Sequence, residues 1–126
     1  MGISRIKYTS GVLLHPTSFP SSYGIGDLGS SAYEFIEWLH QTGFTLWQVL
    51  PLAPPAENLC PYFSHSSVGG NPLLISPDKL VTMGLLEESD LPSKEITGMV
   101  DVEIATKIKS PLFKKAFRSF LQDSQK

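Results

Sequence analysis

Two short apolar runs on either side of one amphipathic segment constrain the fold of this chain more than any other sequence feature. The first run, residues 11–14 (GVLL), is apolar at consecutive positions, which suits a strand buried on both faces. The second run, residues 45–52, is rich in β-branched and aromatic side chains and is stopped by Pro51, which cannot extend a β-ladder. With a helix between them and short connections, the two runs predict a βαβ unit with parallel strands.

The segment between the runs has the pattern of a helix that packs one face. Ser31 and Glu34 have the spacing of a capping box, so we expect the helix to begin there. Gly43 supplies the left-handed residue that commonly ends a helix. Four apolar residues recur with the helical period and predict the packed face: Ala32, Phe35, Ile36 and Leu39.

Prolines and glycines divide the rest of the chain into a long loop and two further helices. A Ser-Pro-Asp run at residues 76–78 predicts a two-turn helix that extends to Met83, with Gly84 as its cap. Ser110 and Pro111 predict the start of a last helix. Its apolar face comprises six residues: Leu112, Phe113, Ala116, Phe117, Phe120 and Leu121.

Composition excludes several classes of partner. The chain has 126 residues, a net charge of -2 and 41% apolar residues, so it has no excess of cations for nucleic acid or an anionic membrane surface. No apolar stretch approaches the ~20 residues of a membrane-spanning helix, and the amino terminus lacks the pattern of a signal peptide. The single cysteine, Cys60, has no disulfide partner and no Cys/His neighbours of a zinc site. We therefore expect a soluble, cytoplasmic protein that uses no metal.

Polar residues follow both predicted strands, and loops at the carboxyl ends of parallel strands converge on one face. In the first loop, His15 is either a general base or a hydrogen-bond partner of the loop backbone. Asp27 is either a functional carboxylate or a brace for that loop. The Gly24-Ile25-Gly26 run resembles a fragment of a dinucleotide fingerprint, but its third glycine comes too late, so we reject that interpretation.

The second loop contains a possible sugar platform. Cys60 and His65 are close in sequence, but proximity alone does not support a nucleophile and base or a metal site. Aromatic residues in such a loop can stack on the apolar face of a sugar ring, and Tyr62 and Phe63 are candidates. Core packing is an equal alternative for Phe63.

Three ordered motifs resemble the amino-terminal region of the 4-alpha-glucanotransferases, the amylomaltase or disproportionating-enzyme family (glycoside hydrolase family 77). They are GVLLHPTSFP at residues 11–20, YGIGDLG at 23–29 and LWQVLPL at 46–52. The resemblance continues through Pro61-Tyr62 and residues 70–75 to residues 100–101 and 112–117. It therefore spans nearly the whole chain.

The resemblance implies a (β/α)8 barrel enzyme of the α/β class, of which residues 1–126 form an incomplete amino-terminal part. Residues 53–72 would be its substrate loop, and residues 76–121 the start of a helical subdomain. The family transfers glucan segments with retention, using two carboxylates about 5–5.5 Å apart. Those carboxylates lie in later barrel strands and match no position here, so we expect no catalytic residue in this chain. No metal or organic cofactor is implied.

The resemblance also assigns the substrate-binding residues. Tyr62 matches the tyrosine that stacks on the glucosyl unit next to the scissile bond, and Asn71 helps to shape the same loop. Cys60 stands in place of a serine and is a poorer hydrogen-bond partner for a sugar hydroxyl. Departures from the family pattern occur at residues 57–60 (ENLC), where the family has Tyr-Gly-Asp-Ser, and at Phe63, where it has Gln.

Other residues of the family motifs, His15, Asp27 and Trp47, are expected to hold strand ends and loops together. The expected partners are α-1,4-glucans, such as maltooligosaccharides, starch or glycogen-like polymers, and the remainder of the chain's own barrel. The alternatives are an inert truncated remnant and a non-catalytic glucan-binding module. Two strands without the rest of a barrel are also expected to leave apolar faces and a sheet edge exposed.

Overall fold

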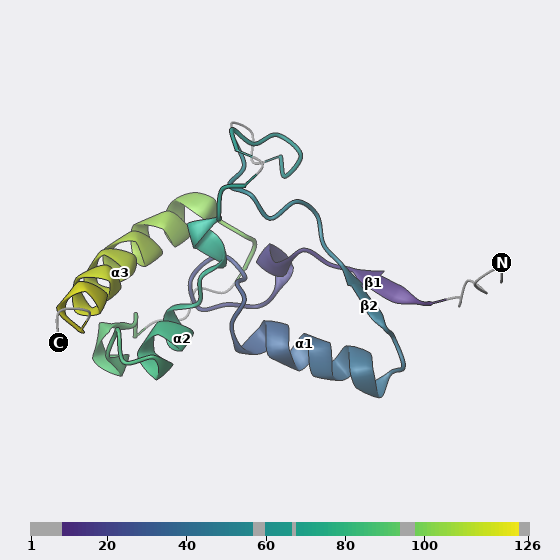
Figure 1. The fold of residues 1–126 in the computed structure, drawn as a ribbon, viewed down its shortest axis with the longest axis horizontal. Helices are drawn as coiled ribbons and strands as arrows, with labels where there is room; N and C mark the ends of the chain where they lie inside the picture. The colour runs from purple at the N-terminus through teal and green to yellow at the C-terminus, as the bar shows by residue number, and fades with distance from the viewer. Residues whose placement is uncertain (1–8, 57–59, 67, 94–97, 124–126) are drawn as a thin grey trace, which may run out of the picture.

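The computed structural model describes residues 9–56, 60–66, 68–93 and 98–123 (Figure 1). Its strands are β1 (Gly11–Leu13) and β2 (Leu46–Gln48), and its α-helices are α1 (Ser30–Gln41), α2 (Pro77–Thr82) and α3 (Val102–Asp123). The described residues also form the 3-10 turns η1 (Pro16–Ser18), η3 (Pro72–Leu74) and η4 (Glu88–Asp90). Figure 1 shows α1 and the strands at one end of the molecule, and α2 and α3 at the other.

The two described strands pair in parallel, which confirms the predicted βαβ unit. Val12 lies opposite Trp47, and Gly11 lies opposite Leu46. A Cβ atom added to Gly11 would lie 2.6 Å from the Cβ of Leu46, so the close approach of the strands requires glycine there. Both strands are shorter than predicted, and the chain leaves the ladder before Pro51.

The prediction that the first strand is buried on both faces is wrong for the described residues. Leu13 is 55% exposed and Leu46 is 53% exposed, because α1 covers only the opposite face of the sheet. The exposed strand residues agree with the expectation that two strands without further barrel elements keep an open apolar face.

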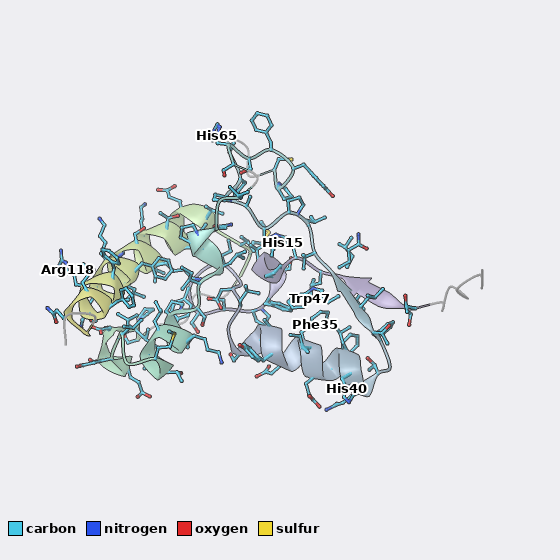
Figure 2. All side chains as sticks on the ribbon, viewed as in Figure 1. His15, Phe35, His40, Trp47, His65 and Arg118 are labelled. Carbon is cyan, nitrogen blue, oxygen red and sulfur yellow. The ribbon has the colours of Figure 1, made fainter. Side chains whose placement is uncertain are left out.

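An aromatic cluster joins α1 to the strands. The ring centroid of Phe35 lies 5.3 Å from that of Trp47 and 5.4 Å from that of Phe19. Figure 2 shows Phe35 and Trp47 between the helix and the sheet. Ala32 and Leu39 are buried as predicted, whereas Ile36 is exposed and does not belong to the packed face.

The predicted capping box at the start of α1 is wrong. The helix begins at Ser30, with Gly29 at the N-cap, and no side chain caps it. The hydroxyl of Ser31 instead donates to the carbonyl oxygen of Pro20, 3.1 Å away, because the preceding loop folds back over this turn. At the other end, Gly43 has a φ of 80°, which confirms its predicted left-handed conformation.

Of the two helices predicted in the rest of the chain, the first agrees with its prediction and the second begins earlier than predicted. Helix α2 and the left-handed Gly84 (φ 73°) occur as predicted. Helix α3 begins at Val102 rather than at Ser110, because Oδ1 of Asp101 accepts a hydrogen bond from the backbone N–H of Ile104 and caps this earlier turn. Pro111 consequently lies inside the helix.

Helices α2 and α3 share a small apolar core. Its buried members are Leu86, Leu112 and Ala116, and partly buried apolar side chains surround them. Phe117, Phe120 and Leu121 lie on the predicted apolar face but are exposed. The carboxyl-terminal half of that face is therefore largely exposed in the part of the chain that the structure describes.

None of the described helices combines the length and apolar character needed to cross a lipid bilayer.

Candidate functional site

The tyrosine expected to contact sugar lies at the tip of a tight turn. The N–H of Phe63 donates to the carbonyl oxygen of Cys60 over 3.0 Å, so Pro61 and Tyr62 are the central residues of a four-residue turn. Proline is favoured at the first central position of such a turn because its φ is already fixed. The side chain of Tyr62 is 72% exposed, so its ring is free to take a ligand. The N–H of Ala56 donates to the carbonyl oxygen of Phe63 over 2.7 Å and holds the two arms of the loop together.

Ser64 braces the same loop from within. Its hydroxyl lies 2.6 Å from the carbonyl oxygen of Pro54, and it accepts a hydrogen bond from the N–H of Ser66 at 3.3 Å. The sequence does not single out Ser64, although serine commonly bonds the backbone two residues on. Figure 2 shows His65 at the outer end of this projecting loop, far from His15.

The other two predicted site residues have different environments. Cys60 is exposed on the turn beside Tyr62. Oδ1 of Asn71 accepts a hydrogen bond from the N–H of Leu73 at 3.0 Å and caps η3. Asn71 also lines an open hollow of about 420 Å³ whose other walls are mostly apolar. The structure therefore brings Cys60 and Tyr62 together and places Asn71 at the base of the loop.

Two sequence alternatives are resolved here. The ring of Phe63 is exposed, so the core-packing alternative is wrong. Nδ1 of His15 lies 2.7 Å from Oγ1 of Thr17 and accepts from the N–H of Thr17, so His15 caps η1. This contact supports the structural role of His15 over the general base.

Residues 57–59, where the sequence departs from the family pattern, lie outside the described residues. Within the described part of the chain, no group of three or more His, Cys, Asp and Glu residues is arranged to hold a metal ion.

A buried ion pair joins α3 to the loop between β1 and α1. Nζ of Lys109 is 2.7 Å from Oδ2 of Asp27, and the two side chains are 0% and 8% exposed. Burial outweighs their mutual attraction, so it raises the pKa of Asp27 and lowers the pKa of Lys109. The hydroxyl of Tyr23 donates to Asp78 over 2.8 Å, and burial followed by this bond raises the pKa of Tyr23.

These contacts confirm that Asp27 braces its loop. Sequence reasoning missed Lys109, because a lysine on a helix normally indicates a solvent-exposed face, and its partner Asp27 is 82 residues away.

Comparison with known proteins identifies the family. The sequence profile described as 4-alpha-glucanotransferase, glycoside hydrolase family 77, matches residues 14–126. The chain belongs to the 4-alpha-glucanotransferase family. The family assignment drawn from the three sequence motifs is therefore confirmed.

Curated 4-alpha-glucanotransferases resemble the chain over most of its length. The chloroplastic/amyloplastic 4-alpha-glucanotransferase of Arabidopsis thaliana is 51% identical over 112 residues, which are 89% of this chain and 19% of that protein. The 4-alpha-glucanotransferase of Aquifex aeolicus is 45% identical over 113 residues, which are 88% of this chain and 23% of that protein. The chain thus spans roughly a fifth of the length of these 4-alpha-glucanotransferases.

A solved structure gives the same result for the fold. The amylomaltase from Streptococcus agalactiae in complex with acarbose superimposes with a TM-score of 0.85 at 36% identity. The match covers 92% of this chain and 24% of the amylomaltase. The fold of this 4-alpha-glucanotransferase segment therefore corresponds to part of a larger enzyme.

Proposed function

We propose that this chain is the amino-terminal part of a 4-alpha-glucanotransferase that transfers α-1,4-glucan segments to the 4-hydroxyl of an acceptor with retention. The observation that carries the proposal is the match of fold and sequence to an amylomaltase over 92% of the chain. That amylomaltase was solved in complex with acarbose, which supports a carbohydrate ligand for this chain as well.

In this proposal the described elements are the first part of a (β/α)8 barrel. The parallel pairing of β1 and β2, with α1 between them in sequence, is the repeating unit of such a barrel. The exposed face of the strands, with Leu13 and Leu46, would pack against the remaining barrel strands. The remainder of its own barrel is therefore the main protein partner of this segment.

The chain supplies part of the donor-sugar site, while the two catalytic carboxylates come from later barrel strands. The exposed ring of Tyr62 offers a flat apolar face to a glucosyl unit, and the turn fixed by Phe63 and Ala56 limits its freedom. Cys60 and Asn71 lie on the same loop as further sugar contacts, Asn71 through its amide nitrogen, since its oxygen caps η3.

The remaining expectations become part of the proposal. The substrates are maltooligosaccharides or starch-like and glycogen-like glucans, and the reaction uses neither metal nor organic cofactor. We place the enzyme in the cytoplasm, away from membranes and nucleic acid, on the composition of the chain.

A chimera tests the proposal. Residues 14–126 would replace the matching segment of the Streptococcus agalactiae amylomaltase, and maltotriose would be the substrate. We expect the chimera to form glucose and longer oligomers. Tyr62→Ala should raise the KM for maltotriose, since a stacked aromatic ring is lost, whereas Tyr33→Ala, which removes an exposed ring on α1, should not. A soluble, folded chimera without transfer activity would contradict the proposal.

A non-catalytic glucan-binding module is the second candidate, because the loop is braced by contacts within the chain itself. Calorimetric titration of the 126-residue chain with maltoheptaose separates the alternatives. Binding that Tyr62→Ala abolishes would support a module, and absence of binding together with an inactive chimera would support an inert remnant.

A further inference from the structure

The ammonium group of Lys109 uses all three of its protons in the protein interior. Besides Oδ2 of Asp27, Nζ donates to the carbonyl oxygens of Leu73 at 2.8 Å and Ile75 at 3.0 Å. An ammonium group has three donors and no acceptor, so its hydrogen-bonding capacity is complete. The side chain has no exposed surface.

These three oxygens belong to two segments that are distant from α3 in sequence. Asp27 lies in the loop that follows β1, whereas Leu73 and Ile75 lie just after the carboxyl end of the loop 53–72, in and next to η3. The N–H of Leu28 donates to the carbonyl oxygen of Leu74 over 3.0 Å and joins the same two segments. The amino end of the loop 53–72 follows β2, so the sheet anchors that end. Lys109 anchors the segment at the opposite, carboxyl end.

The surroundings of the ion pair leave little space for adjustment. A Cβ atom added to Gly29 would lie 2.6 Å from Oγ of Ser76 and 2.7 Å from Oδ1 of Asp27. Ser76 is 3% exposed. Removal of the Lys109 charge would therefore leave the Asp27 carboxylate buried without its cationic partner, which is costly in a site of this kind.

Packing of α3 does not depend on these contacts alone. Leu112 and Ala116 of α3 bury themselves against Leu86, on the side of α2 and η4. The contacts of Lys109 with Leu73 and Ile75 are therefore separable from the packing that holds α3 in place.

We propose that Lys109 is a positioning residue for the loop 53–72 and fixes the place of Asn71 and of the Tyr62 turn. The consequence for glucan binding rests on the proposed function. The inferred role of Lys109 in holding the loop does not depend on the proposed function.

Hydrogen–deuterium exchange of the 126-residue chain tests the link. In Lys109→Met, amides of the loop and its base, at Phe63 and Leu73, should exchange about tenfold faster or more, while amides of α1 keep their rates. Lys107→Met is the matched control, because Lys107 lies on the same helix but its side chain is 71% exposed and pairs with Glu103, one turn away. Unchanged loop exchange in Lys109→Met would overturn the proposal.

Leu112→Ala separates positioning from simple packing. It weakens the α2 and α3 core without touching the ion pair, so the exchange of the loop should change less than in Lys109→Met. An equal acceleration of the loop in both variants would show that α3 acts only through its packing, and the proposal would fall.

A double variant distinguishes a local effect on the loop from global unfolding of the chain. If Lys109→Met speeds exchange in α1 as well, Asp27→Asn/Lys109→Met removes both charges together and relieves the unpaired carboxylate. We expect the double variant to restore the α1 rates and to keep fast exchange at Phe63 and Leu73. Loop rates equal to those of the unaltered chain would overturn the proposal.

The same amylomaltase chimera supplies the enzymatic readout. Lys109→Met should raise the KM for maltotriose about tenfold with a smaller change in kcat, because a displaced loop weakens sugar binding. A lower kcat at unchanged KM would contradict positioning. An inactive chimera with Lys109 intact would instead count against the proposed function, and the exchange result would still decide the role of Lys109.

Discussion

The indole Nε1 of Trp47 donates a hydrogen bond of 2.7 Å to the carbonyl oxygen of Leu14, 33 residues earlier in the chain. Trp47 lies opposite Val12 in the sheet, so its side chain reaches along the neighbouring strand to the point where that strand ends. One residue therefore packs against α1 and ties the end of β1, which confirms the expected role of Trp47.

The first prediction concerns this bond. Trp47→Phe keeps an aromatic ring against Phe35 but leaves the carbonyl of Leu14 without its donor, so the free energy of unfolding should fall by about 1–3 kcal/mol. Urea unfolding followed by circular dichroism measures the change. Trp38→Phe is the control, because Trp38 is half exposed on α1 and should cost less. Equal losses in the two variants would show that the hydrogen bond contributes nothing.

Gly26 permits a second prediction, because the backbone approaches it closely. A Cβ atom there would lie 2.6 Å from the backbone nitrogen of Phe19 and 2.7 Å from its carbonyl oxygen. Backbone atoms cannot move aside as a flexible side chain does, so Gly26→Ala should lower the free energy of unfolding by about 1–3 kcal/mol. Gly70→Ala, where no atom lies within 4 Å of the new Cβ, should change it by less than about 0.5 kcal/mol. A well-tolerated Gly26→Ala would mean that the loop can shift.

The βαβ unit was predictable because its signals are local. Hydrophobic patterning and the left-handed Gly43 each act within a few residues, and the parallel pairing of the strands and the φ of Gly43 agree with them. The capping box failed because α1 begins at Ser30, before the predicted cap, and the hydroxyl of Ser31 donates to the carbonyl oxygen of Pro20, which the preceding loop brings to the start of α1. A local signal was overridden by a tertiary contact.

The candidate site shows the same difference between local signals and tertiary contacts. Pro61 favours a turn at this point because its φ is fixed, and the family motif singles out Tyr62. This part of the site could therefore be predicted from the sequence. The role of Lys109 could not, because its partners lie 82, 36 and 34 residues away and nothing in α3 itself distinguishes it from an exposed lysine.

The third prediction is a dependence of stability on alkaline pH. The pKa of Tyr23 is raised in the folded chain, first by burial and then by its hydrogen bond to Asp78. Above about pH 10 the unfolded chain loses this proton while the folded chain keeps it, so the free energy of unfolding falls as pH rises. The stabilisation is complete below that pH.

Tyr23→Phe should remove this part of the alkaline loss. The lowered pKa of Lys109 gives a slope of opposite sign, but both proteins retain Lys109, so the difference between them isolates Tyr23. Urea unfolding at several pH values on either side of about pH 10 measures both slopes. Identical slopes for the two proteins would rule out the proposed contribution of the Tyr23 proton.

The last prediction follows from the position of Pro111. Sequence reasoning placed this proline at the start of a helix, where its missing N–H costs nothing, but the cap at Asp101 begins α3 well before Ser110. Inside the helix, Pro111 cannot donate to the carbonyl oxygen of Lys107, and its ring crowds the preceding turn.

Pro111→Ala should therefore raise the free energy of unfolding by about 1–3 kcal/mol, since the exposed position leaves no cavity when the ring is removed. Urea unfolding gives the value, and Lys114→Ala, at an exposed position of the same helix, should change it by less than about 0.5 kcal/mol. If Pro111→Ala destabilises the chain, the backbone geometry that the proline imposes is needed by its neighbours. Because Lys109 lies two residues away, such a result would predict faster exchange in the loop 53–72 as well, which the same exchange measurement would detect.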